Sequence, residues 1–507
     1  MKKTLEITLF ALLLAVSLCL APSCQKPESE KPDENPASDP IGDETAEKPT
    51  DEPFVEPEVP AKDYGGAQFT VLYPFWGDFE TQIFGDQETE AGTELDDAIW
   101  RRNKKIEDQL NITFNPIVLG TRGSDTIKEV LPAVRKSVMA GDGSYDLVFI
   151  HPMCDLNAFA QTQLLRNFNK MPHVDLSKPY WNQSLNDTLA VNNILLFAAN
   201  DAIIPSPSVI YFNKKILQDY GMDSPYDYVR NGSWTWEKFS QMATQITRDL
   251  NGDGIYDEHD LYGFSILLDG SGMIAMMHSC DQYIAKKNED GEPILDLMSE
   301  KLVSLIDIIY DLVWGGNQTY TWTTDMWSDE TQRSLYENFF PREHALFCLG
   351  SPSTGASKEL RAMEVDFGIV PYPKYDEAQK DYISLNNAGL MCIPQDVKDP
   401  EMVGIVVELL GAESRRYTIP AYYDVLLTYK GARDEDSLEM LKIIFENTVY
   451  DFGYNYCNFT NAAYIVPRVI AQKSTNVASF YDANAPAYER ELASAYKNLI
   501  KYEDLDF

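Results

Sequence analysis

The hydrophobic pattern at the start of the folded region alternates between the periods of strand and helix. Short apolar runs predict strands at 69–73, 112–119 and 145–150. Apolar residues at helical spacing predict intervening helices at 93–110 and 127–138. This strand–helix–strand–helix–strand order predicts a parallel sheet covered on both faces. Pro132 falls inside the second helical pattern, so we expect it in a first turn or at a kink.

A second series of apolar segments begins near residue 200. The predicted strands lie at 208–212, 261–268, 366–370 and 391–393, and predicted helices begin at Trp234 and Pro400. In open sheets of this kind, ligands sit beyond the carboxyl ends of the strands. Trp76 and Asp78 follow the first strand and His151 follows the third. These residues are therefore the first candidates for a binding site.

Length and charge narrow the choices. The chain has 507 residues and a formal net charge of −37, which argues against nucleic acid or an anionic membrane surface as a partner. A body of about 440 residues is too long for one ordinary core and predicts two lobes. The body's cysteines are scattered without C-x-x-C pairing, so we interpret them mainly as buried small hydrophobic residues, with at most one or two disulfides: Cys154, Cys280, Cys348, Cys392 and Cys457.

The N-terminus has the layout of an export signal. Lys2 and Lys3 precede an apolar stretch at 9–20 that is too short to span a bilayer, and a small residue, Ser23, stands before Cys24. This arrangement resembles the lipobox of bacterial lipoproteins, although Ala21 stands where that pattern prefers Leu. We therefore predict a signal peptide at 1–23 and lipidation of Cys24. Ordinary cleavage nearby, with Cys24 a bystander, is the alternative.

Residues 24–62 form the predicted tether. Beyond Cys24 the segment is dense in Pro, Glu and Asp and has few apolar side chains to bury. Such a segment cannot offset the entropy cost of its own ordering, so we expect it to be extended and disordered. Following a lipidated cysteine, it would hold a folded body away from a membrane.

The segment 249–260 has the spacing of an EF-hand calcium loop. Oxygen-bearing side chains stand at loop positions one, three, five, nine and twelve, a glycine stands at position six, and a backbone carbonyl serves position seven. The predicted ligands are Asp249, Asn251, Asp253, Ile255 through its carbonyl, Asp257 and Asp260. We expect a structural Ca²⁺ ion here, and the alternative is a polar turn without metal.

Several segments follow one another in the order found in a known family. They are Tyr145-Asp146-Leu147-Val148, Ile210-Tyr211-Phe212-Asn213-Lys214, Trp234-Thr235-Trp236-Glu237, His344-Ala345-Leu346-Phe347, the run from Asp366 to Lys374, and Asp399-Pro400-Glu401. This order resembles family 1 extracellular solute-binding proteins, which include maltodextrin-binding proteins. The resemblance implies a two-lobed α/β periplasmic-binding-protein-like fold of type II, with crossing hinge strands and the ligand in a cleft between the lobes. It also implies delivery of the solute to an ABC permease.

On this basis we expect a first lobe formed by 63–199 and 390–455, and a second formed by 200–389 and 456–507. Candidate ligand-binding residues are Trp76, Asp78, His151, Asp201, Ser351 and Tyr422. Sugar binders of the family often have a Trp after the strand that ends here in Phe347, and this chain has Cys348 to Pro352 instead. The position of Trp76 is equally consistent with a cleft residue and with a core residue. Asp201 could bind ligand hydroxyls or could cap a turn.

The sequence contains no G-x-S-x-G, H-E-x-x-H, P-loop or G-x-G-x-x-G motif. Paired carboxylates are unavoidable in so acidic a chain, so they do not indicate a glycosidase. We therefore expect a binding protein and not an enzyme: a monomeric, lipid-anchored, cell-surface protein of an ABC importer that captures a carbohydrate, with an oligosaccharide favoured. The rival interpretations are a surface glycoside hydrolase and a structural surface protein without a small ligand.

Overall fold

The computed structural model describes residues 54–75, 94–120, 124–152, 154–428, 435–457 and 462–505. The predicted signal peptide, Cys24, Trp76 and Asp78 lie outside the described residues. The end of the predicted tether lies inside them, and it is not free of the body. Glu58 pairs with Lys178 at 2.9 Å, and Lys62 pairs with Glu401 at 2.9 Å. Within 54–62, the last residues of the predicted tether thus contact the body through these two ion pairs.

The first sheet has the predicted parallel arrangement with one addition. Strand β1 (Ala67–Pro74) pairs in parallel with β2 (Ile112–Leu119) and with β3 (Leu147–Ile150). Strand β12 (Leu390–Cys392) adds to β3 in the antiparallel direction, so the order is β12-β3-β1-β2. Helices α2 (Glu94–Leu110), α3 (Ser124–Ala140) and α13 (Pro400–Glu413) belong to this first lobe. Pro132, expected in a first turn or at a kink, lies in the interior of α3 and not in its first turn.

The second sheet is larger and mixed, with the order β10-β4-β9-β5-β8. Its strands are β4 (Val209–Asn213), β5 (Tyr262–Leu267), β8 (Thr319–Trp322), β9 (Ala345–Gly350) and β10 (Phe367–Pro371). Strand β5 is parallel to β8 and β9, whereas β4 is antiparallel to β9 and β10. Helices α8 (Trp236–Ile246), α9 (Ser271–Ser279) and α15 (Glu435–Glu446) contact this sheet. The predicted first lobe includes 390–455, and within that range α15 packs on β10 of the larger sheet.

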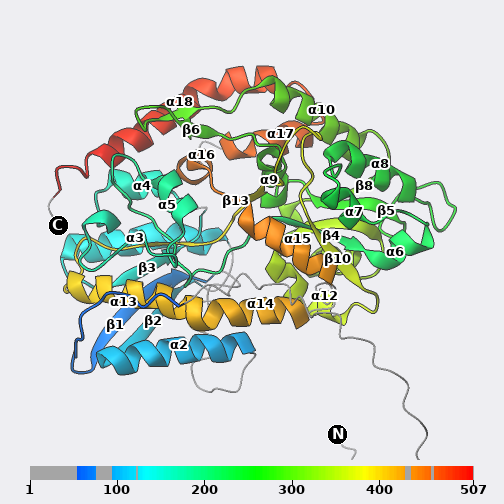
Figure 1. Ribbon diagram of the computed structural model, residues 1–507. Helices are drawn as coiled ribbons and strands as arrows, with labels where there is room; N and C mark the ends of the chain where they lie inside the picture. Colours follow the sequence, from blue (N-terminus) through cyan, green and yellow to red (C-terminus); the bar gives the residue numbers. More distant parts are fainter. Residues whose placement is uncertain are drawn as a thin grey trace, which may run out of the picture. The chain divides into compact units, whose positions relative to one another are not determined.

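The other elements complete the two lobes. They are α4 (Leu156–Gln161), α5 (Gln183–Leu189), α6 (Lys214–Asp219), α7 (Pro225–Arg230), β6 (Ala285–Lys287), β7 (Pro293–Leu295), α10 (Glu300–Trp314), α11 (Glu330–Phe339), α12 (Lys358–Ala362), β11 (Ser384–Leu385), α14 (Ile419–Thr428), β13 (Thr448–Val449), α16 (Phe452–Tyr456), α17 (Ile465–Ala471) and α18 (Val477–Ile500). Helix α18, red in Figure 1, contacts α4 at one end of the fold and α10 and α17 at the other. None of the described helices is long and apolar enough to cross a membrane.

Two chain segments cross between the sheets side by side. Residues 198–208 lead from the first lobe to β4, and residues 385–391 lead back to β12. They pair in the antiparallel direction at Ala198 with Met391 and at Pro207 with Asn386. The Ser208 N–H donates to the Leu385 carbonyl at 3.0 Å, and the Asn387 N–H donates to the Ser206 carbonyl at 3.1 Å. These are the predicted crossing strands, and a third connection runs through a π-helical turn (Ser414–Thr418) into α14.

Trp234, just before α8, and Trp236, its first residue, are packing residues. Both side chains are fully buried, and each indole N–H has a partner: the Pro371 carbonyl at 2.8 Å for Trp234 and the Ser279 hydroxyl at 3.1 Å for Trp236. Both rings contact Phe239 edge to face. Because buried indoles need a hydrogen-bond partner, these bonds fix the position of α8 on the sheet.

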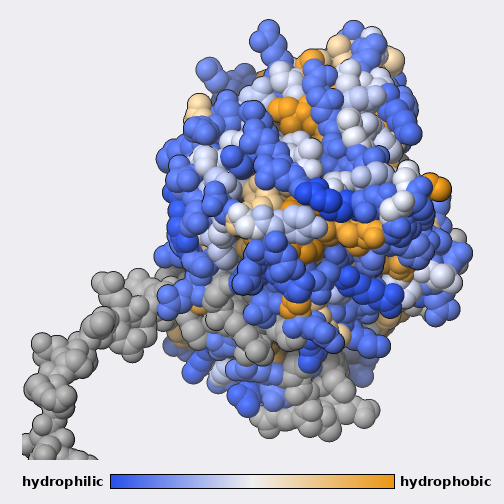
Figure 2. All heavy atoms as spheres, turned by 90° about the vertical axis from the view of Figure 1, so that its right-hand side faces the viewer, coloured by the Kyte–Doolittle hydropathy of each residue, from blue (hydrophilic) through white to orange (hydrophobic). Residues whose placement is uncertain are grey.

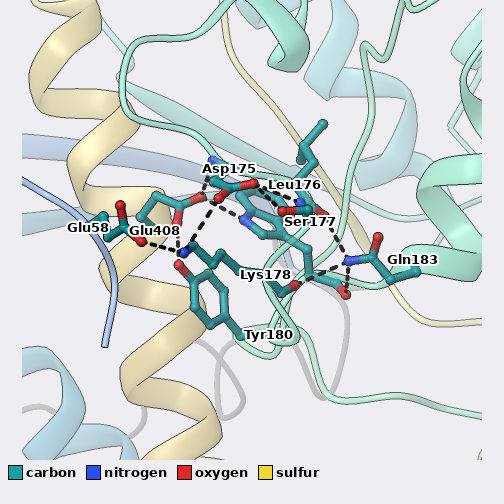
Figure 3. Close-up of polar contacts among 9 residues, drawn as sticks. Glu58, Asp175, Leu176, Ser177, Lys178, Tyr180, Gln183 and Glu408 are labelled. Atoms are coloured by element: carbon teal, nitrogen blue, oxygen red, sulfur yellow. Dashed lines mark hydrogen bonds and ion pairs between the residues drawn. The ribbon is translucent and has the colours of Figure 1, made fainter. Parts of the chain in front are cut away.

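A buried carboxylate ties a surface loop of the first lobe to α13 (Figure 3). Glu408 is 1% exposed and accepts hydrogen bonds from the Tyr180 hydroxyl, from the Trp181 indole at 2.7 Å and from the Asp175 backbone N–H at 3.0 Å. Lys178 lies over the same group and pairs with Asp175 at 3.6 Å. Both carboxylate oxygens accept at least one hydrogen bond, and these bonds hold the loop in place.

The end face of the second lobe is mostly hydrophilic, with small separate hydrophobic patches (Figure 2). The large apolar side chains that are exposed stand singly or in small groups, such as Leu250 and Ile255 in the predicted calcium loop. Isolated exposed apolar residues are normal on a protein surface. This surface therefore does not by itself indicate a docking site. The body's cysteines are all free thiols, and Cys348 alone among them is not fully buried.

Candidate functional site

A cavity of about 550 Å³ lies where the crossing strands meet the two lobes. We call it the interlobe cleft. His151, at the carboxyl end of β3, lines it from the first lobe, and Ser206 and Asn387 line it from the two crossing strands. The second lobe supplies the rest of the wall from the end of β9, the start of α9, and α11 and α12. The placement agrees with the rule that ligands bind beyond the carboxyl ends of strands.

Small hydroxyl side chains dominate the polar part of this wall. The lining includes Ser206, Ser208, Ser265, Ser271, Ser351, Thr354 and Ser357. Each hydroxyl is both a donor and an acceptor, so such a wall matches a ligand that is itself rich in hydroxyls. Apolar surface from Leu267, Leu349 and Phe340 lies between them. A cleft of a few hundred Å³ with mixed apolar and converging polar groups is typical of a small-molecule site.

His151 is a neutral member of the lining. It is 3% exposed, and burial lowers the pKa of its imidazole to about 3. The ring therefore carries no charge near neutral pH and offers one donor and one acceptor. The Cys154 N–H donates to the His151 carbonyl at 2.9 Å, which fixes the turn after β3.

Ser351 also lines the cleft, at the start of the turn after β9. Its backbone N–H donates to the Thr354 hydroxyl at 3.0 Å, and its own hydroxyl lies 2.9 Å from that of Ser353. The segment after β9 thus forms a short 3₁₀ turn at the position where the sequence resemblance led us to look for a tryptophan. Of the predicted ligand-binding residues within the described part of the chain, His151 and Ser351 are the ones that share the cleft.

Asp201 and Tyr422 line a different, smaller cavity of about 290 Å³. Asp201 pairs with Arg415 at 3.1 Å, and its backbone N–H donates to the Tyr180 carbonyl at 2.9 Å. Tyr422 is 5% exposed and packs in the hydrophobic cluster beneath α14. These contacts give both residues a role in holding the hinge region together. The structure does not bring them into the lining of the interlobe cleft.

Two carboxylates in the cleft wall were not among the residues predicted from sequence. Glu337 on α11 and Glu359 on α12 both line the interlobe cleft. The sequence holds 79 acidic residues, so these two cannot be distinguished from the remainder by pattern alone. The only available signal is their position on two helices that flank the strand ending at Gly350.

The 249–260 segment forms a closed loop between α8 and β5. Its sixth residue, Gly254, has a positive φ of 79°, as the predicted sharp turn requires. Its carboxylates accept backbone N–H groups of the loop itself: Asp249 from Gly252 at 2.6 Å and Gly254 at 2.8 Å, and the fully buried Asp260 from Leu250 at 2.9 Å. Among the described residues, no three His, Cys, Asp or Glu side chains gather in a way that would hold a metal ion. The spacing of the oxygen-bearing residues in 249–260 is that of a calcium loop, and the calcium site stays a prediction.

No sequence-family model matches the chain, and no curated protein sequence matches it either. Solved structures do match. A cyclic α-maltosyl-1,6-maltose binding protein from Arthrobacter globiformis superposes with a TM-score of 0.56 at 11% identity, over 85% of this chain and 100% of that one. An ABC substrate-binding protein from Listeria monocytogenes in complex with cycloalternan superposes with a TM-score of 0.53 at 13% identity, over 87% of this chain and 100% of that one.

An ABC transporter solute-binding protein from Thermotoga lettingae bound to α-D-tagatose gives a TM-score of 0.53 at 16% identity, over 84% of this chain and 100% of that one. These structural neighbours are substrate-binding proteins and not enzymes. At such low identity the likeness concerns the fold. The protein therefore has the two-lobed α/β fold of the sugar-binding proteins of ABC transporters, as the order of its sequence segments predicts.

Proposed function

We propose that the protein captures a carbohydrate, with an oligosaccharide favoured, in the interlobe cleft. The observation that carries the proposal is a hydroxyl-rich cavity of about 550 Å³ placed at crossing strands between two lobes. Structural neighbours with the same fold have been solved with tagatose and with cycloalternan. A wall of serine and threonine hydroxyls, with apolar surface between them, suits the alternating hydroxyl and C–H faces of a sugar.

Capture works by domain closure about the crossing strands. Each lobe has its own sheet, and the paired segments 198–208 and 385–391 are the short connections that absorb a rotation. A ligand touching both walls binds the closed form better than the open form, and this differential affinity drives closure. His151 from the first lobe and the serines of the second lobe are on opposite sides of such a rotation.

The setting of the proposed capture is the outer face of a cell membrane. The export-type N-terminus, Cys24 and the acidic segment that follows support a lipid-anchored body held at a distance from the bilayer. In that setting the closed form is recognised by an ABC permease, which takes up the sugar. The protein acts as a monomer in this scheme, and the 249–260 loop supplies a structural calcium site away from the cleft.

A thermal-shift screen tests the proposal. A ligand that binds only the native state must raise the melting temperature. We expect at least one mono- or oligosaccharide to raise it and amino acids and peptides to leave it unchanged. Consumption of the sugar by the purified protein would replace the binding function with a glycoside hydrolase. An unchanged melting temperature with every sugar, amino acid and peptide would favour a structural surface protein.

A further inference from the structure

We infer that the interlobe cleft discriminates by charge: it accepts uncharged or amino-bearing glycans and rejects anionic ones, with Glu337 and Glu359 as the specificity-determining side chains. This inference rests on the proposed sugar-binding function and names the class of sugar. The inference comes from the charged side chains of the cleft wall, because the hydroxyl groups alone do not determine whether the cleft prefers a neutral, cationic or anionic sugar.

The charged groups of the wall all have one sign. Among the lining residues that the structure describes, Glu337 and Glu359 are the acidic ones, and there is no lysine or arginine. The imidazole of His151 also lines the cleft, and its burial lowers the pKa to about 3, so it adds no positive charge. An anionic ligand that enters this cleft therefore meets two carboxylates and no cation in the described wall.

The nearest basic side chains do not reverse this sign. Arg333 is one turn from Glu337 on α11 and forms an ion pair with it, with Arg333 Nε 3.8 Å from Glu337 Oε1, although Arg333 is not among the residues that line the cleft. Lys358 and Arg361 flank Glu359 on α12, and both are exposed residues outside the lining. The side chains of Glu337 and Arg333 are 38% and 35% exposed, so solvent screens both members of this pair to a similar extent. The cleft itself remains acidic.

The acidic wall affects the three ligand classes differently. The carboxylate of a uronate loses its hydration on entering the cleft and is repelled by Glu337 and Glu359, so a uronate binds more weakly than its neutral counterpart. A neutral sugar donates hydroxyl protons to the carboxylates, and hydrogen bonds to an ionised acceptor are stronger than those between neutral groups. An amino sugar adds an ammonium group, which the same carboxylates attract. Discrimination against a wrong charge by like-charge contact is a common route to specificity.

The test uses trisaccharides matched in backbone and different in charge, titrated by calorimetry into the purified full chain. The pairs are cellotriose with its triglucuronate, mannotriose with trimannuronate and galactotriose with trigalacturonate, and the glucosamine trimer is the cationic partner of cellotriose. In every pair with measurable binding, we expect the uronate to bind about tenfold more weakly or worse. For the cellotriose backbone, we expect the glucosamine trimer to bind at least as tightly as cellotriose.

The double variant Glu337→Gln/Glu359→Gln assigns the effect to these side chains. The double variant should reduce the difference in affinity between a neutral trisaccharide and its uronate. Glu489→Gln, at an exposed site on α18, should leave that difference as it is in the wild type. If the double variant does not fold, the two single variants replace it. A uronate that binds as tightly as its neutral partner, or a difference that the glutamine variants do not change, overturns the inference and leaves sugar binding intact. Binding of no trimer at all contradicts the proposed function itself.

Discussion

The backbone N–H of Ser206 donates a hydrogen bond to the side-chain Oδ1 of Asn386 at 2.8 Å, joining the two strands that cross between the lobes. Ser206 also lines the interlobe cleft, so one residue belongs to both the hinge and the proposed site. The amide of Asn386 donates in turn to the hydroxyl of Tyr450, which also accepts from Asn182 of the first lobe. A buried polar network thus fixes the hinge from which closure would start.

Asn386→Ala tests this network. Asn386 is 4% exposed, and its removal leaves the Ser206 N–H without the side-chain acceptor that it has now. We expect a loss of about 1–3 kcal/mol of stability, seen as a lower melting temperature. The surface variant Asn169→Ala, which also loses side-chain hydrogen bonds, serves as the control and should cost much less. Equal melting temperatures for the two variants would show that the hinge does not depend on Asn386.

Glu408→Gln should change how stability depends on pH. Burial raises the pKa of Glu408 above its ordinary value of 4.5, and this effect outweighs the hydrogen bonds from Tyr180, Asp175 and Trp181, which lower it. The folded protein therefore holds this proton more tightly than the unfolded chain. The corresponding stability is fully present below pH 4.5 and is lost as the pH rises through the raised folded value.

Glutamine cannot ionise, and its carbonyl can keep the bonds from Trp181 and Asp175. The stability of the wild type relative to Glu408→Gln should consequently decline as the pH rises from 4.5, measured by urea unfolding at several pH values. Glu489→Gln, at an exposed position, should show no such trend. A relative stability of Glu408→Gln that is independent of pH would mean that burial does not perturb this carboxyl.

Calcium should raise the melting temperature, and a chelator should lower it. The loop brings Asp249, Asp253, Asp257 and Asp260 within a dozen residues, so a divalent cation offsets their repulsion. Magnesium should act less, because it demands tighter octahedral geometry. Asp249→Asn keeps an acceptor for the Gly252 and Gly254 N–H groups and should still weaken the calcium response. Coincident melting curves with calcium and with chelator would exclude the metal site.

Cys24→Ala should release the protein from the membrane. The position of the cysteine after a short apolar segment predicts that it carries the lipid. In cells given labelled fatty acid, the wild type should be labelled and membrane-bound, and the variant should be unlabelled and in the soluble fraction. A variant that remains labelled in the membrane fraction would contradict the lipoprotein assignment.

Local pattern was sufficient to predict much of the fold. The apolar pattern placed β1, β2 and α2 within a few residues, because α2 buries one face of a helix and β1 is a short apolar run buried within the sheet. The order of weak segments indicated the two-lobed fold. Sequence could not show that β12 adds in the antiparallel direction, since strand direction at a sheet edge depends on the path of the chain between lobes.

The site was harder to predict because a cleft is made by residues far apart in sequence. His151 follows from the strand-end rule, and the structure places it in the cleft lining. Asp201 was also a candidate, as a polar residue among apolar neighbours. Its carboxylate pairs with Arg415, which lies more than 200 positions away and which no local sequence pattern reveals. Glu337 and Glu359 line the cleft only because the fold brings α11 and α12 to the same wall as the end of β9, and no sequence motif marks this arrangement.

The central claim, that sugar is captured in the interlobe cleft, is tested most directly by blocking that cleft. Ser271 lines it as an exposed residue at the start of α9, so Ser271→Trp fills the cavity without disturbing the core, and Ser304→Trp on the surface of α10 is the matched control. Calorimetry would use the tightest-binding neutral sugar among cellotriose, mannotriose and galactotriose. The account predicts that Ser271→Trp weakens binding by about tenfold or more and that Ser304→Trp binds like the wild type. Wild-type affinity in folded Ser271→Trp would show that the sugar binds elsewhere.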